Sequence, residues 1–594
     1  MVDDGSAFHV AGWRLDRLHY IQILHIESSS QMYTSISMFF PRANMMSSNP
    51  RPSMAALPAN LHVVAPFTVV ACSLLVLAFL HYLATKTTAT MKRELHRLPP
   101  GPAGLPIIGS VHHLMYNKPV FRWIHRLVKE MNTKIMCLRF GPVHVIVVNC
   151  PEIAREVMRK NDAVFASRPL TFASSSFSFG YKGSILSPYG EQWKKMRRVM
   201  TSEILSPALE RRLHARRAEE ADHLVRFVYN QCNDTKANNG VDIRHVARHF
   251  CGDMIRKLVF SKRYFVEPPL VSAGAGPGPN EVEHVDALFT LVNCVYSFCI
   301  SDYFPVLRGG LDLDGHEKVV HGVMATLNRL HDPIIEERIH EWSILRKHGE
   351  KREIQDFLDV LVSLEDSEGQ ALLSFEEIKA QAAEIMFAIV DNPSNAVEWA
   401  LAEMMNKPEV MEKAMNELNT VVGKERLVQE SDIPRLNYLK SCIREAFRLH
   451  PYHAFNVPHV AMKDTTLSGY TIPKDSHVII SRVGLGRNPD IWDAPLEFQP
   501  ERHLSGSSDV LLTEPDLRFI SFGTGRRGCP GVSLGSFVTM MLFARLLQGF
   551  TWTKLPGVRA IELKESTTSL ALSEPLILQA EPRLPVHLYE SISS

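Results

Sequence analysis

The sequence predicts a mainly α-helical protein with a minor β-sheet and one N-terminal transmembrane helix. Three observations lead to this prediction. Residues 61–84 contain no Asp, Glu, Lys or Arg. From about residue 120 the chain is mostly a succession of amphipathic helical patterns. Short β-like runs interrupt these patterns, as at residues 144–148 and 477–480.

Composition is that of an ordinary globular protein. The 594 residues carry 65 Lys and Arg against 64 Asp and Glu, a balance that does not indicate nucleic-acid binding. Nine scattered cysteines without Cys-x-x-Cys spacing argue against a disulfide framework or a zinc site, and for a reducing compartment. No internal repeat divides the body.

The N-terminal stretch has two parts. Residues 1–60 show no periodic pattern, so we expect them to be disordered or an extension of the gene model. Residues 61–84 are long enough to span a bilayer, which takes roughly 20 apolar residues. Lys86, Lys92 and Arg93 follow, and the positive-inside rule then places the body in the cytosol. A cleaved signal peptide is the alternative, but the run is too long, so we expect a single-pass anchor.

Residues 85–109 link the anchor to the body. They begin basic and continue as Pro-Pro-Gly-Pro-Ala-Gly-Leu-Pro at positions 99–106. Prolines fix φ and remove hydrogen-bond donors, so a stiff, non-helical tether is expected. Residues 110–594 then form the main domain, with a surface loop rich in Pro and Gly at 267–280.

Trp193 and Arg197 share one face of a predicted basic helix, because they are four residues apart. A guanidinium at this position suits a carboxylate partner. Lys194, Lys195 and Arg198 make the surrounding surface basic. Taken alone, the pattern Trp-x-x-x-Arg is more often a solvated helix face.

A long helix is predicted around residues 376–406, and it contains the run Asp391-Asn392-Pro393. Pro393 lacks an N–H and clashes with the carbonyl of Ile389, which predicts a kink and a carbonyl free to hold water or substrate. An amide such as Asn392 can orient water but cannot pass on a proton as a hydroxyl can. A kink without functional meaning is the alternative for Pro393 alone.

Two charged motifs follow. Glu445 and Arg448 are three residues apart on another predicted helix, a spacing typical of a local ion pair. A Pro-Glu-Arg run comes later and ends in Arg502, which His503 follows.

Cys529 lies in the run Phe-Gly-Thr-Gly-Arg-Arg-Gly-Cys-Pro-Gly that begins at Phe522. Glycines allow close backbone approach, backbone N–H groups can bond a thiolate, and Arg527 is a nearby cation. These conditions lower a thiol pKa and favour a metal ligand. The apolar run at 532–547 predicts a helix whose N-terminus favours negative charge. A buried structural cysteine is the alternative, but the whole pattern is far more specific than a lone cysteine.

The pattern Phe-x-x-Gly-x-Arg-x-Cys-x-Gly resembles the haem-thiolate signature of the cytochrome P-450 monooxygenases. The two charged motifs precede it in that family's order, and the resemblance covers residues 99–585. It implies the cytochrome P-450 fold, with haem b (iron protoporphyrin IX) between the long central helix and the helix after the cysteine. It also implies O2 as substrate and electrons from NADPH through a separate NADPH-cytochrome P-450 reductase, on the cytosolic face of the endoplasmic reticulum membrane.

The resemblance assigns roles to individual residues. In this family the Trp-x-x-x-Arg pair bonds a haem propionate, and the basic patch around it faces the reductase. The ion-pair triad holds the core below the haem. The candidates are Cys529 as iron ligand; Trp193, Arg197, His459, Arg527 and Phe522 as further cofactor-binding residues; Asp391, Asn392 and Pro393 as catalytic residues in the oxygen-activating groove; and Glu445, Arg448 and Arg502 as structural residues.

Departures from the general pattern resemble one plant branch of the family, the amino-acid N-hydroxylases that make aldoximes. Asn392 replaces the usual Thr, His459 an arginine, and His503 an aromatic residue. Gly531 is a small departure from that branch back towards the general pattern. The branch implies two N-hydroxylations of an L-amino acid, then dehydration and decarboxylation to an E-aldoxime, in plant specialised metabolism such as cyanogenic glucoside or glucosinolate formation.

We expect the substrate to be an aromatic L-amino acid, phenylalanine or tyrosine first and tryptophan next. Aromatic rings near the family's pocket positions favour this prediction, although filling the core is the commonest fate of phenylalanine. Two alternatives stay open: a C-hydroxylating cytochrome P-450 acting on a terpenoid or phenylpropanoid, and a non-catalytic haem-binding membrane protein. The substrate-pocket candidates are Phe172, Phe177, Phe179, Phe387, Phe455 and Asn456.

Overall fold

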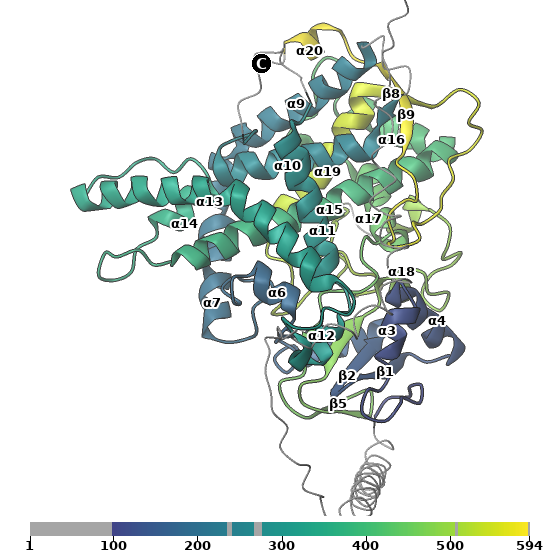
Figure 1. Cartoon of the computed structure of the whole chain (residues 1–594). Coiled ribbons are helices and arrows are strands. Elements are labelled where there is room, and N and C mark those ends of the chain that lie inside the picture. The colour runs from purple at the N-terminus through teal and green to yellow at the C-terminus, as the bar shows by residue number, and fades with distance from the viewer. Residues whose placement is uncertain (1–97, 234–239, 266–275, 505–508, 592–594) are drawn as a thin grey trace, which may run out of the picture. The chain divides into compact units, whose positions relative to one another are not determined.

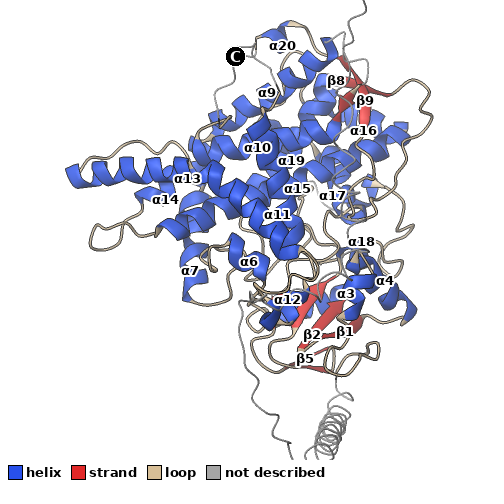
Figure 2. Ribbon diagram, in the orientation of Figure 1, coloured by secondary structure: helices blue, strands red, loops and turns tan. Residues whose placement is uncertain are grey.

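The computed structural model describes residues 98–233, 240–265, 276–504 and 509–591. The N-terminal segment, the expected anchor at 61–84 and residues 85–97 lie outside this part, so those assignments stay predictions. The described residues belong to one compact unit, Ala84–Ser594. The unit is mainly helical with small sheets (Figures 1 and 2), which confirms the predicted fold class.

Helix α15 (Phe375–Asn406) runs through the centre of the helical part (Figure 1). It begins with a capping box, in which Ser374 Oγ accepts from the Glu377 N–H and the Glu377 carboxylate accepts from the Ser374 N–H. The helix continues through Pro393 to the end predicted from the sequence. Most of its residues are buried, because other helices cover it on several sides.

Four of the helices that pack against α15 make the most extensive contacts with it. They are α10 (Ile243–Phe260), α11 (Pro279–Val295), α17 (Asn437–Leu449) and α19 (Val532–Gly549). Helix α19 follows the cysteine-containing loop, so its contact with α15 brings that loop to the centre of the fold. Buried apolar side chains from all five helices form one continuous core.

Helix α19 is also the helix, within the described residues, that is long and apolar enough to cross a membrane. Its 18 residues have a mean hydropathy of 1.3, yet 78% of the stretch is buried inside the fold. Such burial is typical of a core helix of a globular domain.

A four-stranded sheet lies apart from the helical core, at the lower end of the view in Figure 2. Its order is β1 (Ile135–Phe140), β2 (Val143–Val148), β7 (His477–Ile480) and β4 (His459–Val460). The two runs predicted as strands are β2 and β7, which pair in parallel with Val145 opposite His477. The short β4 pairs with β7 and so carries His459 towards the helical part. The smaller sheets are β3 (Val241–Asp242) with β9 (Ile577–Pro582) and β8 (Phe550–Lys554), and β5 (Thr465–Leu467) with β6 (Tyr470–Ile472).

The remaining helices surround this framework. Part of the loop predicted at 267–280 lies outside the described residues, and its end is already the first turn of α11. The Pro-Glu-Arg motif forms a short 3-10 turn at Pro500–His503. The other helices are α3 (His112–Tyr116), α4 (Val120–Glu130), α5 (Pro151–Arg155), α6 (Phe172–Phe177), α7 (Glu191–Arg198), α8 (Pro207–Arg212), α9 (His214–Asn233), α12 (Ile300–Tyr303), α13 (His316–His348), α14 (Phe357–Ser363), α16 (Pro408–Val421), α18 (Arg482–Gly486) and α20 (His587–Glu590).

Candidate active site

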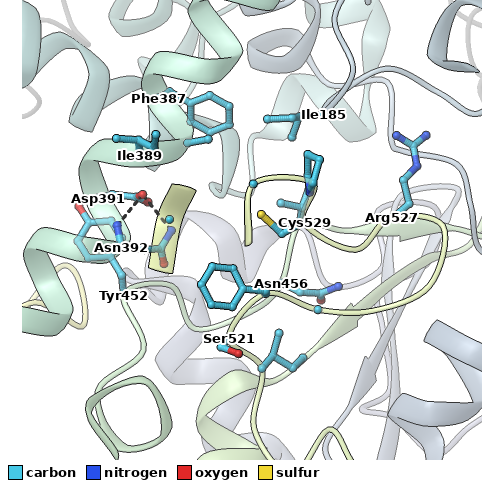
Figure 3. Close-up of a pocket in the computed structure, with 18 of the residues that line it drawn as sticks. Ile185, Phe387, Ile389, Asp391, Asn392, Tyr452, Asn456, Ser521, Arg527 and Cys529 are labelled. Atoms are coloured by element: carbon cyan, nitrogen blue, oxygen red, sulfur yellow. Dashed lines mark hydrogen bonds between the residues drawn. The ribbon is translucent and has the colours of Figure 1, made fainter. Parts of the chain in front are cut away.

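A large cavity lies between α15, the start of α19 and the loop that carries Cys529 (Figure 3). Its empty space, open mouth included, is about 1650 Å³. Its lining is mostly apolar with a few convergent polar and charged side chains, as is usual for a site that binds a small molecule or a cofactor. Of the residues predicted for the site, those lining the cavity are Arg197, Phe387, Asp391, Asn392, Pro393, Asn456, His459, Phe522, Arg527 and Cys529.

Cys529 lies in a tight loop at the cavity wall. Its N–H donates to Phe522 O at 2.9 Å, and a Cβ at Gly525, where φ is +73°, would lie 2.0 Å from Met158 O. Glycine is therefore required at that position. Figure 3 shows the sulfur pointing into the space between this loop and α15.

The environment of the sulfur differs in one respect from the sequence-based expectation. Burial raises the pKa of the Cys529 thiol, while the Gly531 N–H, Arg197 and Arg482 act in the opposite direction. The cations that act on the thiol are therefore Arg197 and Arg482, whereas the Arg527 side chain bonds the backbone carbonyls of Ala166 and Ser187.

Three arginines place positive charge at one side of the cavity. Arg168 donates to Val457 O and Pro458 O, both at 2.8 Å, and Arg197 to Gly528 O at 2.7 Å. Arg527 donates to Ala166 O at 2.5 Å and to Ser187 O at 2.7 Å. In the part of the chain that is described, none of the three pairs with a carboxylate. Burial lowers the pKa of Arg527 to about 8, with Arg168 and Arg197 adding to the effect, so an anionic ligand would relieve their repulsion.

Trp193 and His459 complete this side of the cavity. The guanidinium of Arg527 lies 4.6 Å from the Trp193 ring centroid, and the indole Nε1 is buried with no partner in the described structure. His459 donates from Nδ1 to Phe165 O at 2.7 Å, and burial lowers its pKa to about 3, so its ring is neutral. A cationic rim, a free indole donor, apolar walls and a facing cysteine together fit a haem with two propionates.

On the opposite wall, Asp391 is held in a polar cluster. Its Oδ1 accepts from the Asn392 N–H at 2.7 Å and from Asn392 Nδ2 at 3.0 Å (Figure 3), and its Oδ2 accepts from His453 Nε2 at 3.0 Å. The His453 ring stacks on Tyr296, with centroids 3.7 Å apart. Burial lowers the pKa of His453 and outweighs the opposing influence of Asp391.

The phenylalanines predicted for the substrate pocket lie in different places, and only some of them are near the cavity. Phe387 borders the cavity, and Phe177 packs behind it edge-to-face at 5.1 Å. Phe179 lies under Lys379, and Phe172 packs on His321. Phe455 belongs to a separate cluster with His125 and Phe298. Asn456 lines the cavity, but its Oδ1 accepts from the Ile480 N–H at 2.7 Å and so holds two chain segments together.

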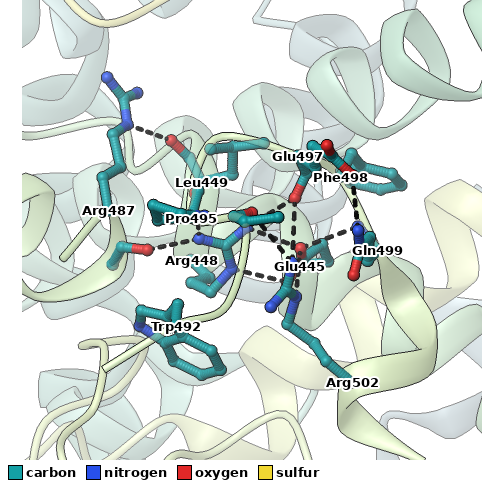
Figure 4. A network of polar contacts seen from close by, with 12 residues as sticks. Glu445, Arg448, Leu449, Arg487, Trp492, Pro495, Glu497, Phe498, Gln499 and Arg502 are labelled. Atoms are coloured by element: carbon teal, nitrogen blue, oxygen red, sulfur yellow. Dashed lines mark hydrogen bonds and ion pairs between the residues drawn. The ribbon is translucent and has the colours of Figure 1, made fainter. Parts of the chain in front are cut away.

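The predicted triad does assemble, away from the cavity (Figure 4). Glu445 accepts from Arg448 Nε and Nη2, both at 2.7 Å, and from Arg502 Nε at 3.0 Å. His503 Nε2 also lies 2.8 Å from Glu445 Oε2. The fully buried Arg448 also donates hydrogen bonds to backbone carbonyls, among them Pro495 O at 2.7 Å. The cluster ties α17 to the segment that leads to the cysteine-containing loop.

Sequence reasoning missed Arg168, Tyr296 and Arg482, all of which line the cavity. They come from three distant segments and belong to no spaced motif. One signal was available for the arginines: each follows a serine at the end of an apolar run, as Ser167-Arg168 and Ser481-Arg482.

Comparisons with known proteins agree with this geometry. The sequence pattern of the cytochrome P450 family matches residues 99–579. Tyrosine N-monooxygenase of Sorghum bicolor is 61% identical over 500 residues, covering 84% of this chain and 88% of that protein. Valine N-monooxygenase 1 of Manihot esculenta and tryptophan N-monooxygenase 1 of Arabidopsis thaliana are 53% and 52% identical, each covering 83% of this chain and 89% and 90% of their own lengths. A zebrafish cytochrome P450 structure with abiraterone superposes with a TM-score of 0.61 at 25% identity, over 79% of this chain and 100% of that one.

Proposed function

Because the chain belongs to the cytochrome P450 family, in its group of plant amino-acid N-monooxygenases, we propose that it N-hydroxylates an aromatic L-amino acid twice and forms the E-aldoxime. The 61% identity to a tyrosine N-monooxygenase supports tyrosine or phenylalanine as substrate. Phe387 at the cavity wall, with Phe177 behind it, offers an aromatic surface for the substrate ring.

Family membership brings haem b, with electrons supplied by a reductase. We assign the iron ligand to Cys529 and the propionate contacts to Trp193, Arg197, His459 and Arg527, with Phe522 against the macrocycle. When bound, haem supplies the activation of O2. The chain supplies the thiolate, the charge that balances the propionates, and walls that exclude water.

The catalytic assignment concerns the middle of α15. Asn392 and His453 fix the orientation of the Asp391 carboxylate, and Pro393 leaves Ile389 C=O without its helical donor. Ile389 itself lines the cavity. We propose that this carbonyl and the Asp391–Asn392 pair hold water or the substrate nitrogen, in place of the hydroxyl that Asn392 replaces.

We assign the electron donor to NADPH-cytochrome P450 reductase, docking on the basic face of α7. Arg198 and Lys194 are exposed there, Lys194 in an exposed pair with Glu191 at 2.7 Å. Lys195 is bound to the buried Glu377 at 2.8 Å and contributes less to this surface. We also propose an endoplasmic reticulum location, with residues 61–84 as the anchor, residues 85–109 as the link and the domain from residue 110 in the cytosol.

The observation that carries the proposal is that Cys529 and the Asp391-Asn392-Pro393 turn face one cavity. The test is a panel of L-amino acids incubated with microsomes, reductase and NADPH, with oximes read by mass spectrometry. We expect the oximes of tyrosine and phenylalanine first and that of tryptophan next. Oximes from aliphatic amino acids alone would refute the aromatic assignment, and hydroxylated products without any oxime would refute N-hydroxylation.

A further inference from the structure

Arg482 lies in the cavity wall, and its guanidinium makes no hydrogen bond within the described residues. It is the first residue of α18, separated from the end of β7 by Ser481, and its backbone N–H donates to Ala454 O at 2.9 Å. Ser481 caps the helix by accepting from the Gly484 N–H at 2.7 Å. The backbone is thus fixed, yet within the described residues the buried Nε has no partner and the side chain forms no ion pair with a carboxylate.

The neighbouring arginines make contacts that the Arg482 side chain lacks. Arg487, five residues further on, donates to Leu449 O at 2.8 Å and pairs with Glu565 at 2.6 Å. Arg197 and Arg527 donate hydrogen bonds to backbone carbonyls. A buried donor left without a partner costs roughly 1–3 kcal/mol, and more when it is charged. The cost at Arg482 disappears if an anionic ligand occupies the cavity.

Arg482 lies close to the polar cluster around Asp391. Burial raises the pKa of Tyr296, and the largest opposing influence is the charge of Arg482. Arg482 likewise adds to the lowering of the His453 pKa that burial causes. His453 stacks on Tyr296 and bonds Asp391 at 3.0 Å. A cation and an anion therefore face one cavity, and Asp391 is the acidic residue among those that line it.

We propose that Arg482 binds the α-carboxylate of the amino-acid substrate, while Asp391 accepts a hydrogen bond from its α-nitrogen. A guanidinium offers two parallel N–H donors that match a carboxylate. The Asp391 carboxylate receives three hydrogen bonds and has about four lone-pair sites, so one acceptor site is left. The inference rests on the proposed function and assigns the groups that recognise the part common to all L-amino acids.

The experiment compares each ligand with the amine that lacks only its carboxylate. Purified holoenzyme is titrated with L-tyrosine and with tyramine, and the affinity is read from the shift of the haem Soret band. L-Valine and isobutylamine form a second pair in case the side chain preferred is aliphatic. Wild type should bind each amino acid more tightly than its amine.

In Arg482→Met the amino-acid affinity should fall roughly 10- to 150-fold, the worth of a hydrogen bond to a charged group, with the amine affinity unchanged. Arg482→Lys keeps a cation but lacks the planar pair of N–H donors. Its affinity for the amino acid should lie between that of wild type and that of Arg482→Met. Arg526→Met is the matched control, because Arg526 is 47% exposed, pairs with Asp162 at 3.4 Å and loses the same charge. It should leave both affinities unchanged.

Two results would overturn the assignment. An Arg482→Met enzyme that still prefers tyrosine to tyramine would show that the carboxylate binds elsewhere. Loss of haem from both Arg482 variants, measured by the carbon monoxide difference spectrum, would instead assign Arg482 to a propionate. Failure of the wild type to bind any amino acid would refute the proposed function itself, which is a separate outcome.

Discussion

At the residue scale, buried polar and charged groups lack partners around the cavity but are paired in the triad of Glu445, Arg448 and Arg502. Among the described residues around the cavity, the buried Trp193 Nε1 and Arg482 Nε have no hydrogen-bond partner, and Arg168 and Arg527 form no ion pair with a carboxylate. In the triad, both carboxylate oxygens of Glu445 are bound by Arg448, Arg502 or His503. Because unpaired buried donors are costly, the first pattern indicates a binding site and the second a fold-stabilising contact.

Cys529→Ala should abolish haem-thiolate ligation, because alanine offers the iron no donor atom. Reduced wild-type protein with carbon monoxide should show the red-shifted Soret band of thiolate ligation, and the variant should lack both the band and turnover. Cys294→Ala is the control, since Cys294 is buried in α11 and does not line the cavity. A Cys529→Ala enzyme that keeps the band would disprove the assignment.

Glu445→Ala should destabilise the protein by roughly 3–5 kcal/mol, because it leaves buried guanidinium groups without their carboxylate. Little haem-loaded protein is expected, and chemical denaturation of what remains should have a lower midpoint. Glu283→Ala is the control, because Glu283 pairs with Arg329 at the surface and such pairs contribute about 0–1 kcal/mol. A well-folded but inactive Glu445→Ala enzyme would contradict a structural role.

The same carboxylate predicts acid sensitivity. Burial would raise the pKa of Glu445, but the hydrogen bonds from Arg448 and His503 outweigh it and lower the pKa to about 2 from 4.5. A folded-state pKa below the unfolded value stabilises the protein above pH 4.5, and this contribution is lost as the pH falls towards 2. Unfolding measured across this window should therefore be less steep in pH for Glu445→Gln than for wild type. Equal slopes would show that the triad does not control acid stability.

At the element scale, α15 combines a long buried helix with a proline in its middle. Pro393 removes one backbone hydrogen bond just where Asp391, Asn392 and Ile389 line the cavity. An interior proline is unfavourable for a helix, so its position beside the cavity indicates a use for the freed carbonyl.

Pro393→Ala should stabilise the protein by up to about 3 kcal/mol, because it restores the N–H to Ile389 C=O. It should also lower the oxime formed per NADPH consumed, since the carbonyl would no longer be free. Thermal unfolding and product quantification measure the two effects. Pro333→Ala is a matched control, because Pro333 is an exposed interior proline of α13; it should gain stability and keep full activity. Unchanged coupling in Pro393→Ala would remove Pro393 from the mechanism.

At the scale of the whole molecule, the proposed topology places the entire catalytic domain on one side of a membrane. Protease added to sealed microsomes should therefore digest the bulk of the chain, because residues 61–84 leave it on the cytosolic side. A lumenal marker protein in the same vesicles controls for their integrity. Full protection of the chain would show that the domain lies on the lumenal side and that the proposed topology is wrong.

The sequence by itself determined the features that short-range spacing encodes. They are the extent of α15, the glycine-rich loop around Cys529, and the side chains of the triad. Tertiary structure decided which residues meet across long distances in the chain. It placed Phe387 at the cavity and Phe455 in another cluster, and it revealed that the buried Nε of Arg482 has no partner among the described residues. The physical reason is that burial and pairing depend on elements hundreds of residues apart, whereas turns, caps and helix periodicity depend on neighbours.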